Sequence, residues 1–420
     1  MKIGIQTWGS EGDVRPFMAL AAGLRRAGHD VTLVVTHITN SDYSAQGASL
    51  GIPVRSAGRL DPDLAKRAGE ALVGETNVLK QVGIILRDLF DPAAQDMLME
   101  AKRLCQENEL VIGHFLVHPL KTAAEMANKP YVSVFLAPML PSACFPPPGV
   151  PHLGRVMNAM LWKVGGLIMN RMYLPRINEM RLKAGLPQYR NTAHDVLMSS
   201  RLNLIASSPA LFPPPVDWND TIQMCGAFHL PEQGEQWQPP EDLQRFMLNG
   251  PPPLYMTFGS MSLADPAAAE SIALLVNACR LAGCRAIIQT DRIDPGAGTA
   301  SPDIFCLAHA EHHLVFPRCA AVVHHGGAGT SHAASRAGCP SIVVEHATDQ
   351  AFWGGVLHRA GIAPPLLHRR TVTADGLARA IKIVLASSAM REKARAIGES
   401  MRREDGVKRA VELIARQRWD

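Results

Sequence analysis

The stretch from residue 319 to residue 350 constrains the fold of this chain more than any other part of the sequence. An apolar segment over residues 319–324 leads into HHGGAGT, where a helix is expected to begin, and a second apolar segment follows over residues 341–344. A strand that passes through a glycine turn into a helix, and then into another strand, is the repeating unit of a parallel α/β sheet. The sequence therefore predicts an α/β fold.

The glycine turn has the properties of an anion-binding site. The first N–H groups of a helix lack intrahelical partners, and the aligned peptide dipoles place about half a positive charge there. Gly326, Gly327 and Gly329 allow the backbone to approach a phosphate closely. Asp349 and Gln350 follow the next strand, so we expect them at the same carboxyl edge of the sheet, where α/β proteins bind ligands.

Three better-known motifs do not fit this turn. A P-loop requires a lysine after its last glycine, whereas Gly329 is followed by Thr330. The dinucleotide-binding fingerprint G-x-G-x-x-G and the nucleophile elbow G-x-S-x-G are both absent from the turn. For the glycines alone, an ordinary strand-to-helix turn is the alternative to a ligand site.

Length and composition indicate a globular protein of more than one domain. The chain has 420 residues, more than one average core holds, with 47% hydrophobic and 19% charged residues. A formal net charge of +4, with both signs mixed along the chain, does not indicate a nucleic-acid-binding protein. The eight cysteines show no C-x-x-C spacing, which is usual for reduced thiols in a cytosolic protein.

The sequence predicts a cytoplasmic protein. The N-terminus leads directly into a strand and reaches Glu11 and Asp13, so we expect no secretory signal peptide. No run approaches the length of about eighteen apolar residues that a membrane-spanning helix needs. Association with a membrane surface stays open.

The first half of the chain repeats a strand–helix–strand pattern. We expect a strand over residues 2–7, a loop over residues 8–15, a helix that begins near Pro16, and a strand over residues 30–35. The pattern recurs over residues 110–136.

Prolines between residues 206 and 253 leave little room for regular structure and place a linker at residues 229–250. A second domain then opens with a strand over residues 254–258. The chain is expected to end in helices over residues 374–385, 390–401 and 405–417.

The glycine turn and the residues after it resemble a known signature. HHGGAGT, followed by Asp349-Gln350-Ala351-Phe352-Trp353-Gly354, is similar to the donor-binding signature of GT-B-fold glycosyltransferases that use nucleotide sugars. The similarity is greatest to the bacterial branch that glycosylates sterols, lipids, glycopeptide antibiotics and macrolides.

This resemblance implies two Rossmann-like, doubly wound domains that face each other across a cleft. Residues 1–228 would bind the acceptor, and residues 229–250 would be the linker. Residues 251–401 would bind the nucleotide sugar, and a last helix over residues 402–420 would cross back to the first domain.

In the family, residues around the glycine turn bind the donor. The backbone of His312 would face the base, but His309 stands where the family often has an aromatic residue that stacks on uracil, so the base stays open. Asp349 and Gln350 would hold sugar hydroxyls. The donor-binding residues implied by the resemblance are Gly259, Ser260, His312, His325, Gly327, Ala328, Gly329, Thr330, Asp349 and Gln350.

The start of the chain carries a second part of the resemblance. Gly9, Ser10, Gly12, Asp13, Val14 and Pro16 match the family pattern G-S-x-G-D-V-x-P. The resemblance implies that Asp13 is the base that takes the proton of the acceptor hydroxyl, and that His325 helps to stabilise the departing diphosphate. The alternative for Asp13 is a helix-capping or turn carboxylate.

Residues 155–186 form an apolar, basic stretch with roughly helical spacing. We expect a helix that packs on the core with its lysines and arginines in solvent, or a methionine-rich wall for a hydrophobic acceptor that also contacts a membrane surface. The candidate acceptor-binding residues are Ser10, Gly12, Met139, Trp162 and Met169.

We expect neither a metal nor a cofactor. The histidines at positions 309, 312, 313, 324 and 325 lack the H-E-x-x-H motif and accompanying cysteine or carboxylate ligands. His325 and the helix start would instead bind the diphosphate.

The predicted function is inverting, metal-independent transfer of a hexose from a nucleoside-diphosphate sugar to a small hydrophobic acceptor. UDP-glucose is the family's commonest donor, while dTDP sugars and rhamnose stay open. A sterol, a lipid, a polyketide or a flavonoid would suit the acceptor site. The alternatives are a nucleotide-sugar epimerase of the same fold and a non-catalytic protein that binds nucleotide sugars.

Overall fold

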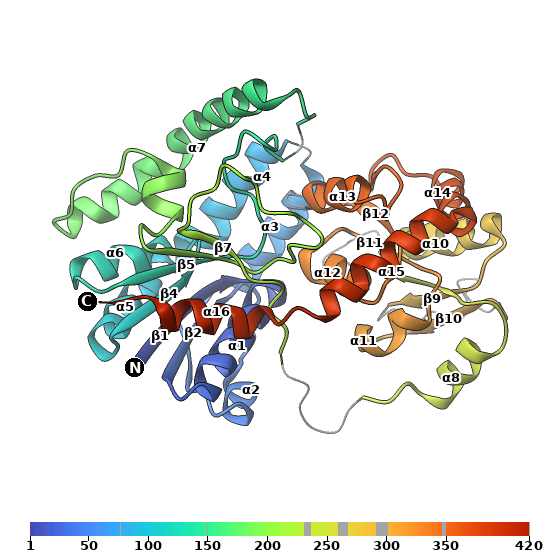
Figure 1. Ribbon diagram of the computed structural model, residues 1–420, viewed down its shortest axis with the longest axis horizontal. Helices are drawn as coiled ribbons and strands as arrows, with labels where there is room; N and C mark the ends of the chain where they lie inside the picture. The colour runs from blue at the N-terminus through green and yellow to red at the C-terminus, as the bar shows by residue number, and fades with distance from the viewer. Residues whose placement is uncertain are drawn as a thin grey trace. The chain divides into compact units, whose positions relative to one another are not determined.

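The computed structural model describes residues 1–75, 77–148, 150–230, 237–258, 268–290, 301–346 and 350–419. The chain forms two compact α/β units, labelled by their helices and strands in Figure 1. The first unit comprises Met1–Ala68, Val82–Pro231 and Glu404–Asp420, and the second comprises Gly69–Gln81 and Glu232–Arg403.

The first unit is built on a seven-stranded sheet in the order β3-β2-β1-β4-β5-β6-β7. All neighbouring strands are parallel, and the central strands are buried along their length because helices cover both faces. The strands are β1 (Lys2–Gly9), β2 (Asp30–His37), β3 (Val54–Ser56), β4 (Leu110–His114), β5 (Tyr131–Phe135), β6 (Leu202–Ile205) and β7 (Ile222–Met224).

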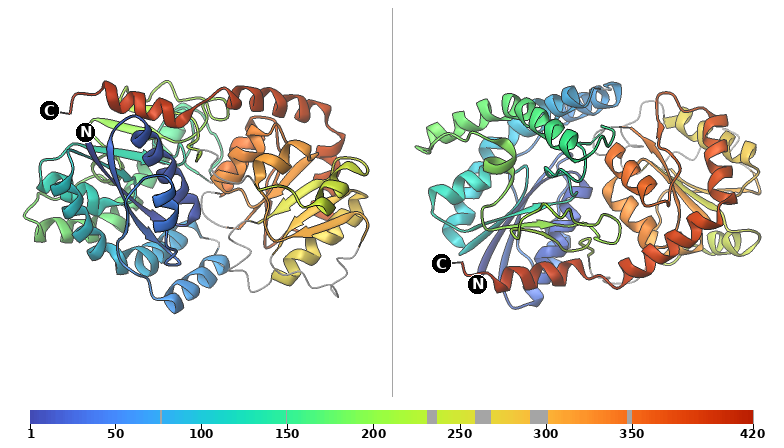
Figure 2. Two further views of the ribbon diagram at one scale, coloured as in Figure 1. Left: turned by 90° about the horizontal axis from the view of Figure 1, so that it is seen from below. Right: turned by 45° about the horizontal axis from the view of Figure 1, so that its top comes forward.

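Helices of very different lengths surround this sheet. α7 is the longest, with 29 residues, and lies on the outside of the first unit in Figures 1 and 2. Among the described residues, no helix combines the length and apolar composition that a membrane span requires. The helices of the first unit are α1 (Glu11–Arg26), α2 (Ser44–Ser49), α5 (Asp91–Glu107), α6 (His118–Met126), α7 (Arg155–Lys183), α16 (Gly406–Arg416) and the π-helical segments η1 (Ile85–Phe90) and η2 (Thr192–Leu197). Two more helices, α3 (Pro62–Gly74) and α4 (Val78–Ile84), belong in part to this unit and in part to the second, which takes Gly69–Gln81.

The first helix begins earlier than the sequence indicated. The prediction of a loop as far as residue 15 and a helix start near Pro16 was wrong, because α1 begins at Glu11. Ser10 is the N-cap residue, and the Asp13 carboxylate accepts a hydrogen bond from its backbone N–H at 2.8 Å, which stabilises the first turn. Pro16 lies inside the helix, where it lacks the N–H that would bond to the carbonyl of Gly12.

The second unit contains a six-stranded sheet in the order β10-β9-β8-β11-β12-β13, again with parallel neighbours. Its strands are β8 (Leu254–Thr257), β9 (Ala286–Gln289), β10 (Ile304–Leu307), β11 (Ala321–His324), β12 (Ser341–Glu345) and β13 (Leu367–His368). Its helices are α8 (Glu241–Leu248), α10 (Ala268–Ala282), α11 (His312–Val315), α12 (Ala328–Arg336), α13 (Gln350–Arg359), α14 (Ala374–Ala386), α15 (Ser388–Arg402) and the 3-10 turn η3 (Phe316–Arg318).

In both sheets the strand order reverses beside the first strand. β1 lies between β2 and β4, and β8 lies between β9 and β11. A doubly wound sheet binds its ligands at this switch point, outside the carboxyl ends of the two strands that flank it. The residues that follow β1, β4, β8 and β11 are therefore the first candidates for function.

Part of the segment expected to be an irregular linker is helical. α8 buries Leu243 and Met247 in a core cluster of the second unit that also contains Tyr255. Pro240 is the N-cap residue of this helix. The prolines of this region flank a helix, and a helix tolerates proline near its start.

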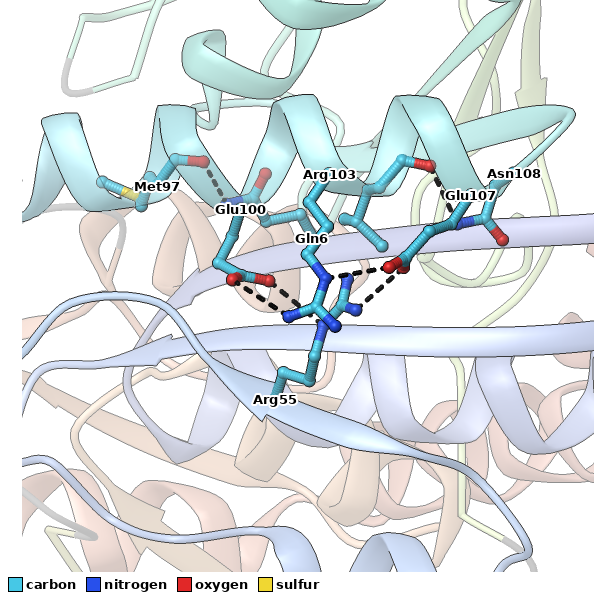
Figure 3. Close-up of polar contacts among 8 residues, drawn as sticks. Gln6, Arg55, Met97, Glu100, Arg103, Glu107 and Asn108 are labelled. Atoms are coloured by element: carbon cyan, nitrogen blue, oxygen red, sulfur yellow. Dashed lines mark hydrogen bonds and ion pairs between the residues drawn. The ribbon is translucent and has the colours of Figure 1, made fainter.

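A polar cluster holds α5 against the first sheet (Figure 3). Arg55 on β3 pairs with Glu100 at 3.1 Å and with Glu107 at 2.8 Å, and Arg103 reaches the same Glu107 at 2.8 Å. Gln6, fully buried on β1, donates a hydrogen bond to a backbone carbonyl of α5 at 3.0 Å. These contacts fix the strand that leads to Asp13.

The last helix, α16, belongs to the first unit and packs against α1. α16 runs along α1 (Figure 2), and the contact depends on a missing side chain, since a Cβ at Gly23 would lie 2.2 Å from Val407 Cγ1. A Cβ at Gly406 would lie 2.4 Å from the carbonyl oxygen of Gly226. The lack of a side chain thus allows the close approach of α1 to α16 at Gly23 and of α16 to the loop after β7 at Gly406.

We expect Gly23→Ala to lower the free energy of unfolding by about 1–3 kcal/mol, because its methyl group overpacks the contact with Val407. The matched control is Gly165→Ala on α7, where a Cβ meets nothing within 4 Å. This control should raise stability by about 0.5–1 kcal/mol, because alanine favours helix more than glycine does. Urea unfolding followed by circular dichroism measures both variants, and equal stabilities would contradict the close packing of α16 on α1.

Candidate functional site

The glycine turn of the second unit joins β11 to α12 and lies at its switch point. Gly326 has a φ of +94°, which side chains rarely adopt, and a Cβ there would lie 2.9 Å from both the Gln350 carbonyl oxygen and Val343 Cγ1. The turn therefore requires glycine, and its close approach brings Gln350 beside it. This confirms that the turn and the start of α13 meet at one edge of the sheet.

The imidazole of His325 lies over the next glycine. A Cβ at Gly327 would be 2.4 Å from His325 Nε2, so the bare backbone makes room for the ring at the N-cap of α12. Burial, and then the nearby His346 and His312, lower the pKa of His325 to about 4. Without a ligand His325 is therefore neutral at neutral pH, and an anion beside it would raise that pKa.

The start of α12 is open. Ser331 donates the first intrahelical hydrogen bond, to the Gly327 carbonyl at 2.9 Å, so the N–H groups of Ala328, Gly329 and Thr330 precede the helical ladder. A Cβ at Gly329 would meet nothing within 4 Å. The described residues thus leave room above the helix start, where three N–H groups and the helix dipole favour a negative charge.

The residues after β12 close the turn from the other side. Gln350, buried at the start of α13, accepts a hydrogen bond from the His346 N–H at 2.7 Å. The ring of His346 packs edge-on against Phe258, at the end of β8, with centroids 4.7 Å apart. Asp349 lies outside the described residues, as do Gly259 and Ser260, so their predicted roles stay predictions.

The last residues of the signature have a packing role. Trp353 is fully buried and contacts the ring of His332 on α12 edge-on at 4.8 Å. A Cβ at Gly354 would lie 3.1 Å from Leu366 Cβ. These residues hold α13 against α12 and so fix Gln350 beside the turn.

The two histidines expected near the base lie at the carboxyl edge of the same sheet. The His312 ring stacks on Phe316 at 4.3 Å with an interplanar angle of 16°. His309 is more exposed and meets Trp237 edge-on at 6.3 Å. Sequence reasoning missed Trp237 and His346, and only the position of His346 just after a strand signalled a role.

Asp13 occupies the switch point of the first unit, on the first turn of α1. Its Oδ2 accepts hydrogen bonds from the Ser10 N–H at 2.8 Å and from the Ser10 hydroxyl at 3.0 Å. Gly9 has a φ of +137°, and a Cβ there would lie 2.2 Å from the same oxygen. The carboxylate is therefore a helix cap, as one reading of the sequence predicted, and its side chain is also 34% exposed.

The candidate acceptor residues come from three parts of the first unit, and their role stays a prediction. Ser10 and Gly12 lie beside Asp13 on the chain, and Ser10 bonds to it. Trp162 on α7 instead donates its indole N–H to the Phe145 carbonyl at 2.8 Å, within the first unit. Met139 and Met169 are half-buried in the loop after β5 and in α7. The structure thus supports a position next to Asp13 only for Ser10 and Gly12.

Over the described ranges, no three histidine, cysteine or carboxylate side chains gather in a way that would hold a metal ion. Metal independence itself stays a prediction.

We expect Gly329→Ala to weaken binding of UDP or dTDP at least tenfold, because its methyl group enters the space above the helix start. Stability should stay the same or rise by up to about 1 kcal/mol, since alanine is the better helix former. Gly376→Ala on the first turn of α14 is the matched control and should leave binding unchanged. Titration calorimetry and thermal unfolding measure both effects, and unchanged binding in Gly329→Ala would remove this helix start from the donor site.

Residues 285–411 match the family described as "Erythromycin biosynthesis protein CIII-like, C-terminal domain". A sterol 3-beta-glucosyltransferase of Cryptococcus neoformans var. neoformans serotype D is 30% identical over 99% of this chain, which spans only 27% of that protein. The sterol 3-beta-glucosyltransferase UGT80B1 of Arabidopsis thaliana is 26% identical over 99% of this chain and 68% of its own length.

Solved structures share the fold over nearly the whole chain. The glycotransferase of kitacinnamycin superimposes with a TM-score of 0.71 at 19% identity, covering 99% of this chain and 98% of that one. The glycosyltransferase VinC, in complex with dTDP, gives a TM-score of 0.68 at 19% identity and covers 99% of each chain. These findings confirm the resemblance inferred from the sequence. The chain therefore has the GT-B fold of glycosyltransferases, and its residues 285–411 are similar to the erythromycin CIII-like C-terminal domain family.

Proposed function

We propose that this protein is an inverting, metal-independent glycosyltransferase that moves glucose from a nucleoside-diphosphate sugar to a hydroxyl of a sterol or a similar hydrophobic acceptor. The observation that carries the proposal is the open start of α12, with His325 above Gly327 and Gln350 beside Gly326. Neutral donors and a helix dipole converge there on a space that the described residues leave open, which suits a diphosphate. The names of the fungal and plant relatives support glucose and a sterol.

In the proposed reaction, the bond between the anomeric carbon and the diphosphate oxygen breaks, and negative charge builds on the leaving group. The N–H groups of Ala328, Gly329 and Thr330 are fixed by the helix before the reaction starts, so they stabilise this charge without reorganising. His325 adds a hydrogen bond, and its affinity for a proton rises as the charge beside it grows. These donors take the place of a divalent cation.

The acceptor oxygen forms the new bond to the anomeric carbon while its proton passes to the Asp13 carboxylate. Attack from the face opposite the diphosphate inverts the anomeric centre. A positioned base of this kind contributes about 10²–10⁴ in rate. The cap formed with Ser10 holds the carboxylate in place and leaves part of it exposed.

The nucleotide base is a separate question from the sugar. VinC is solved with dTDP, whereas the curated relatives carry glucosyltransferase names without a nucleotide. In the proposal His309, whose ring lies edge-on to Trp237, faces the base. UDP-glucose and dTDP-glucose are therefore the two donors to compare.

The test is transfer by the purified protein from UDP-glucose or dTDP-glucose to sterol, lipid and polyketide acceptors with EDTA present, detected as a mass increase of one hexose. We expect Asp13→Asn to lower kcat by about 10²–10⁴ with donor binding preserved. Asp375→Asn, another first-turn carboxylate, is the control and should keep wild-type turnover.

Other outcomes identify the alternatives. Isomerised nucleotide sugar without an acceptor would indicate an epimerase, and donor binding without diphosphate release would indicate a non-catalytic protein. Wild-type turnover in Asp13→Asn would exclude Asp13 as the base, and loss of transfer in EDTA that is restored by Mg²⁺ would contradict metal independence.

We further propose that α7 rests on an anionic lipid surface, from which a hydrophobic acceptor would be taken. Its solvent face is apolar, although such a face is normally polar. No acidic residue occurs from position 155 to position 178, while Arg155, Lys163 and Arg171 are exposed. Apolar side chains flanked by cations fit the boundary between lipid headgroups and acyl chains. The large exposed apolar residues of α7 are Val156, Met157, Met160, Val164, Leu167, Ile168 and Leu182.

We expect the protein to sediment with vesicles that contain phosphatidylserine and not with pure phosphatidylcholine, because the basic residues of α7 add electrostatic attraction. The double variant Val164→Glu/Leu167→Glu should lose this binding. Val216→Glu places an acid at another exposed valine of the first unit and should keep it. Unchanged sedimentation of the double variant would exclude α7, and a dimer of the free protein that the double variant disrupts would make this face a contact between two copies.

A further inference from the structure

His114 is a buried histidine at the switch point of the first unit that neither the sequence patterns nor the proposed function uses. It is the last residue of β4, the strand beside β1, and it faces the start of α1. Its side chain is 2% exposed, and its Nε2 lies 3.7 Å from Asp13 Oδ1. Nε2 makes no hydrogen bond within the described part of the chain.

The tautomer of His114 follows from its other nitrogen. Nδ1 accepts the backbone N–H of Leu116 at 3.4 Å, so in the neutral ring Nε2 carries the hydrogen. Burial lowers the pKa of His114 to about 3, so the ring is neutral at neutral pH. The group that points at Asp13 is therefore an N–H donor.

The ring has little freedom to turn away. Phe17 on α1 and Phe115 pack against it, with centroids 5.7 Å and 4.6 Å from the imidazole. The Asp13 side chain is partly exposed, at 34%. A distance of 3.7 Å exceeds a hydrogen bond, but contacts of catalytic groups are often long without substrate and shorten in the complex.

The second unit contains the same arrangement. His324 ends β11, the strand beside β8, and its Nδ1 accepts the N–H of Gly326 at 3.1 Å. Its Nε2 is likewise buried without a hydrogen bond among the described residues. In both units the last residue of the strand at the switch point is thus a histidine. Its Nδ1 accepts the backbone N–H two residues later, and its Nε2 points away from that turn.

We propose that His114 is a positioning residue for Asp13. The Nε2–H of His114 holds Asp13 Oδ1, while the N–H and the hydroxyl of Ser10 hold Asp13 Oδ2. The proposal rests on the proposed function, because it assigns His114 a part in the transfer of the acceptor proton. In that step the acceptor O–H bond breaks and the proton passes to the Asp13 carboxylate. The acceptor oxygen bonds to the anomeric carbon, the diphosphate leaves, and His114 keeps its own proton throughout.

Two substitutions separate this role from the support of the backbone. His114→Asn places an amide oxygen where Nδ1 stands, so it still accepts the Leu116 N–H, but it has no donor that reaches Asp13. His114→Gln places an amide N–H near the position of Nε2. We expect the Asn variant to lose about tenfold to a hundredfold in kcat, with its KM for the donor and its melting temperature unchanged. The Gln variant should recover most of that loss.

The double variant Asp13→Asn/His114→Asn completes the test. If His114 acts through Asp13, the second substitution should lower kcat no further than Asp13→Asn alone, whereas independent effects would multiply. Multiplied effects, or a full rate in His114→Asn, would overturn this inference and leave the proposed function intact. Wild-type turnover in Asp13→Asn would instead overturn the assignment of Asp13. A His114→Asn variant with a lowered melting temperature and no rescue by Gln would show a purely structural histidine.

Discussion

The absence of a β-carbon at the ends of two central strands is the constraint on which both candidate sites depend. Any side chain at Gly9 would displace the Asp13 carboxylate, whose Oδ2 would lie 2.2 Å from the new Cβ. Gly326 and Gly327 play the same part in the second unit, where a Cβ would meet the start of α13 or the ring of His325. The Asp13 carboxylate, the His325 ring and Gln350 can occupy their positions only because the neighbouring glycines have no side chain, so the turns position these groups before any ligand binds.

The switch points of the two sheets share one feature. A histidine ends the strand beside the central one and accepts the N–H two residues later, as His114 and His324 do. Burial lowers the pKa of each to about 3, so each stays a neutral donor and acceptor with a fixed tautomer. A charged imidazole would carry two donors and could not accept that N–H. Burial is thus what keeps both turns in the conformation that the ligand residues need.

Much of the fold followed from sequence because local patterns carry it. Apolar runs separated by glycine turns predicted the central strands and the helix after residue 328, and similarity to known glycosyltransferases placed the glycine turn. The start of α1 was predicted wrongly because Pro16 has the stronger local signal, whereas the Ser10–Asp13 cap depends on two hydrogen bonds to one carboxylate oxygen. His114 could not be found, since its partner Asp13 lies 101 positions away and only the parallel pairing of β1 with β4 joins them.

Asp13 combines two demands that oppose each other. As a cap its carboxylate accepts hydrogen bonds from the N–H and the hydroxyl of Ser10, and a carboxylate is a weak base towards an alcohol. A weak base suffices only if the acceptor oxygen is already acidic when the proton moves, that is, when its bond to a cationic anomeric carbon is well advanced. In the proposed reaction the diphosphate therefore departs early, and the start of α12 supplies most of the stabilisation. The proposed division of labour follows: the second unit lowers the barrier through fixed donors, and the first unit holds a carboxylate in place to receive a proton late.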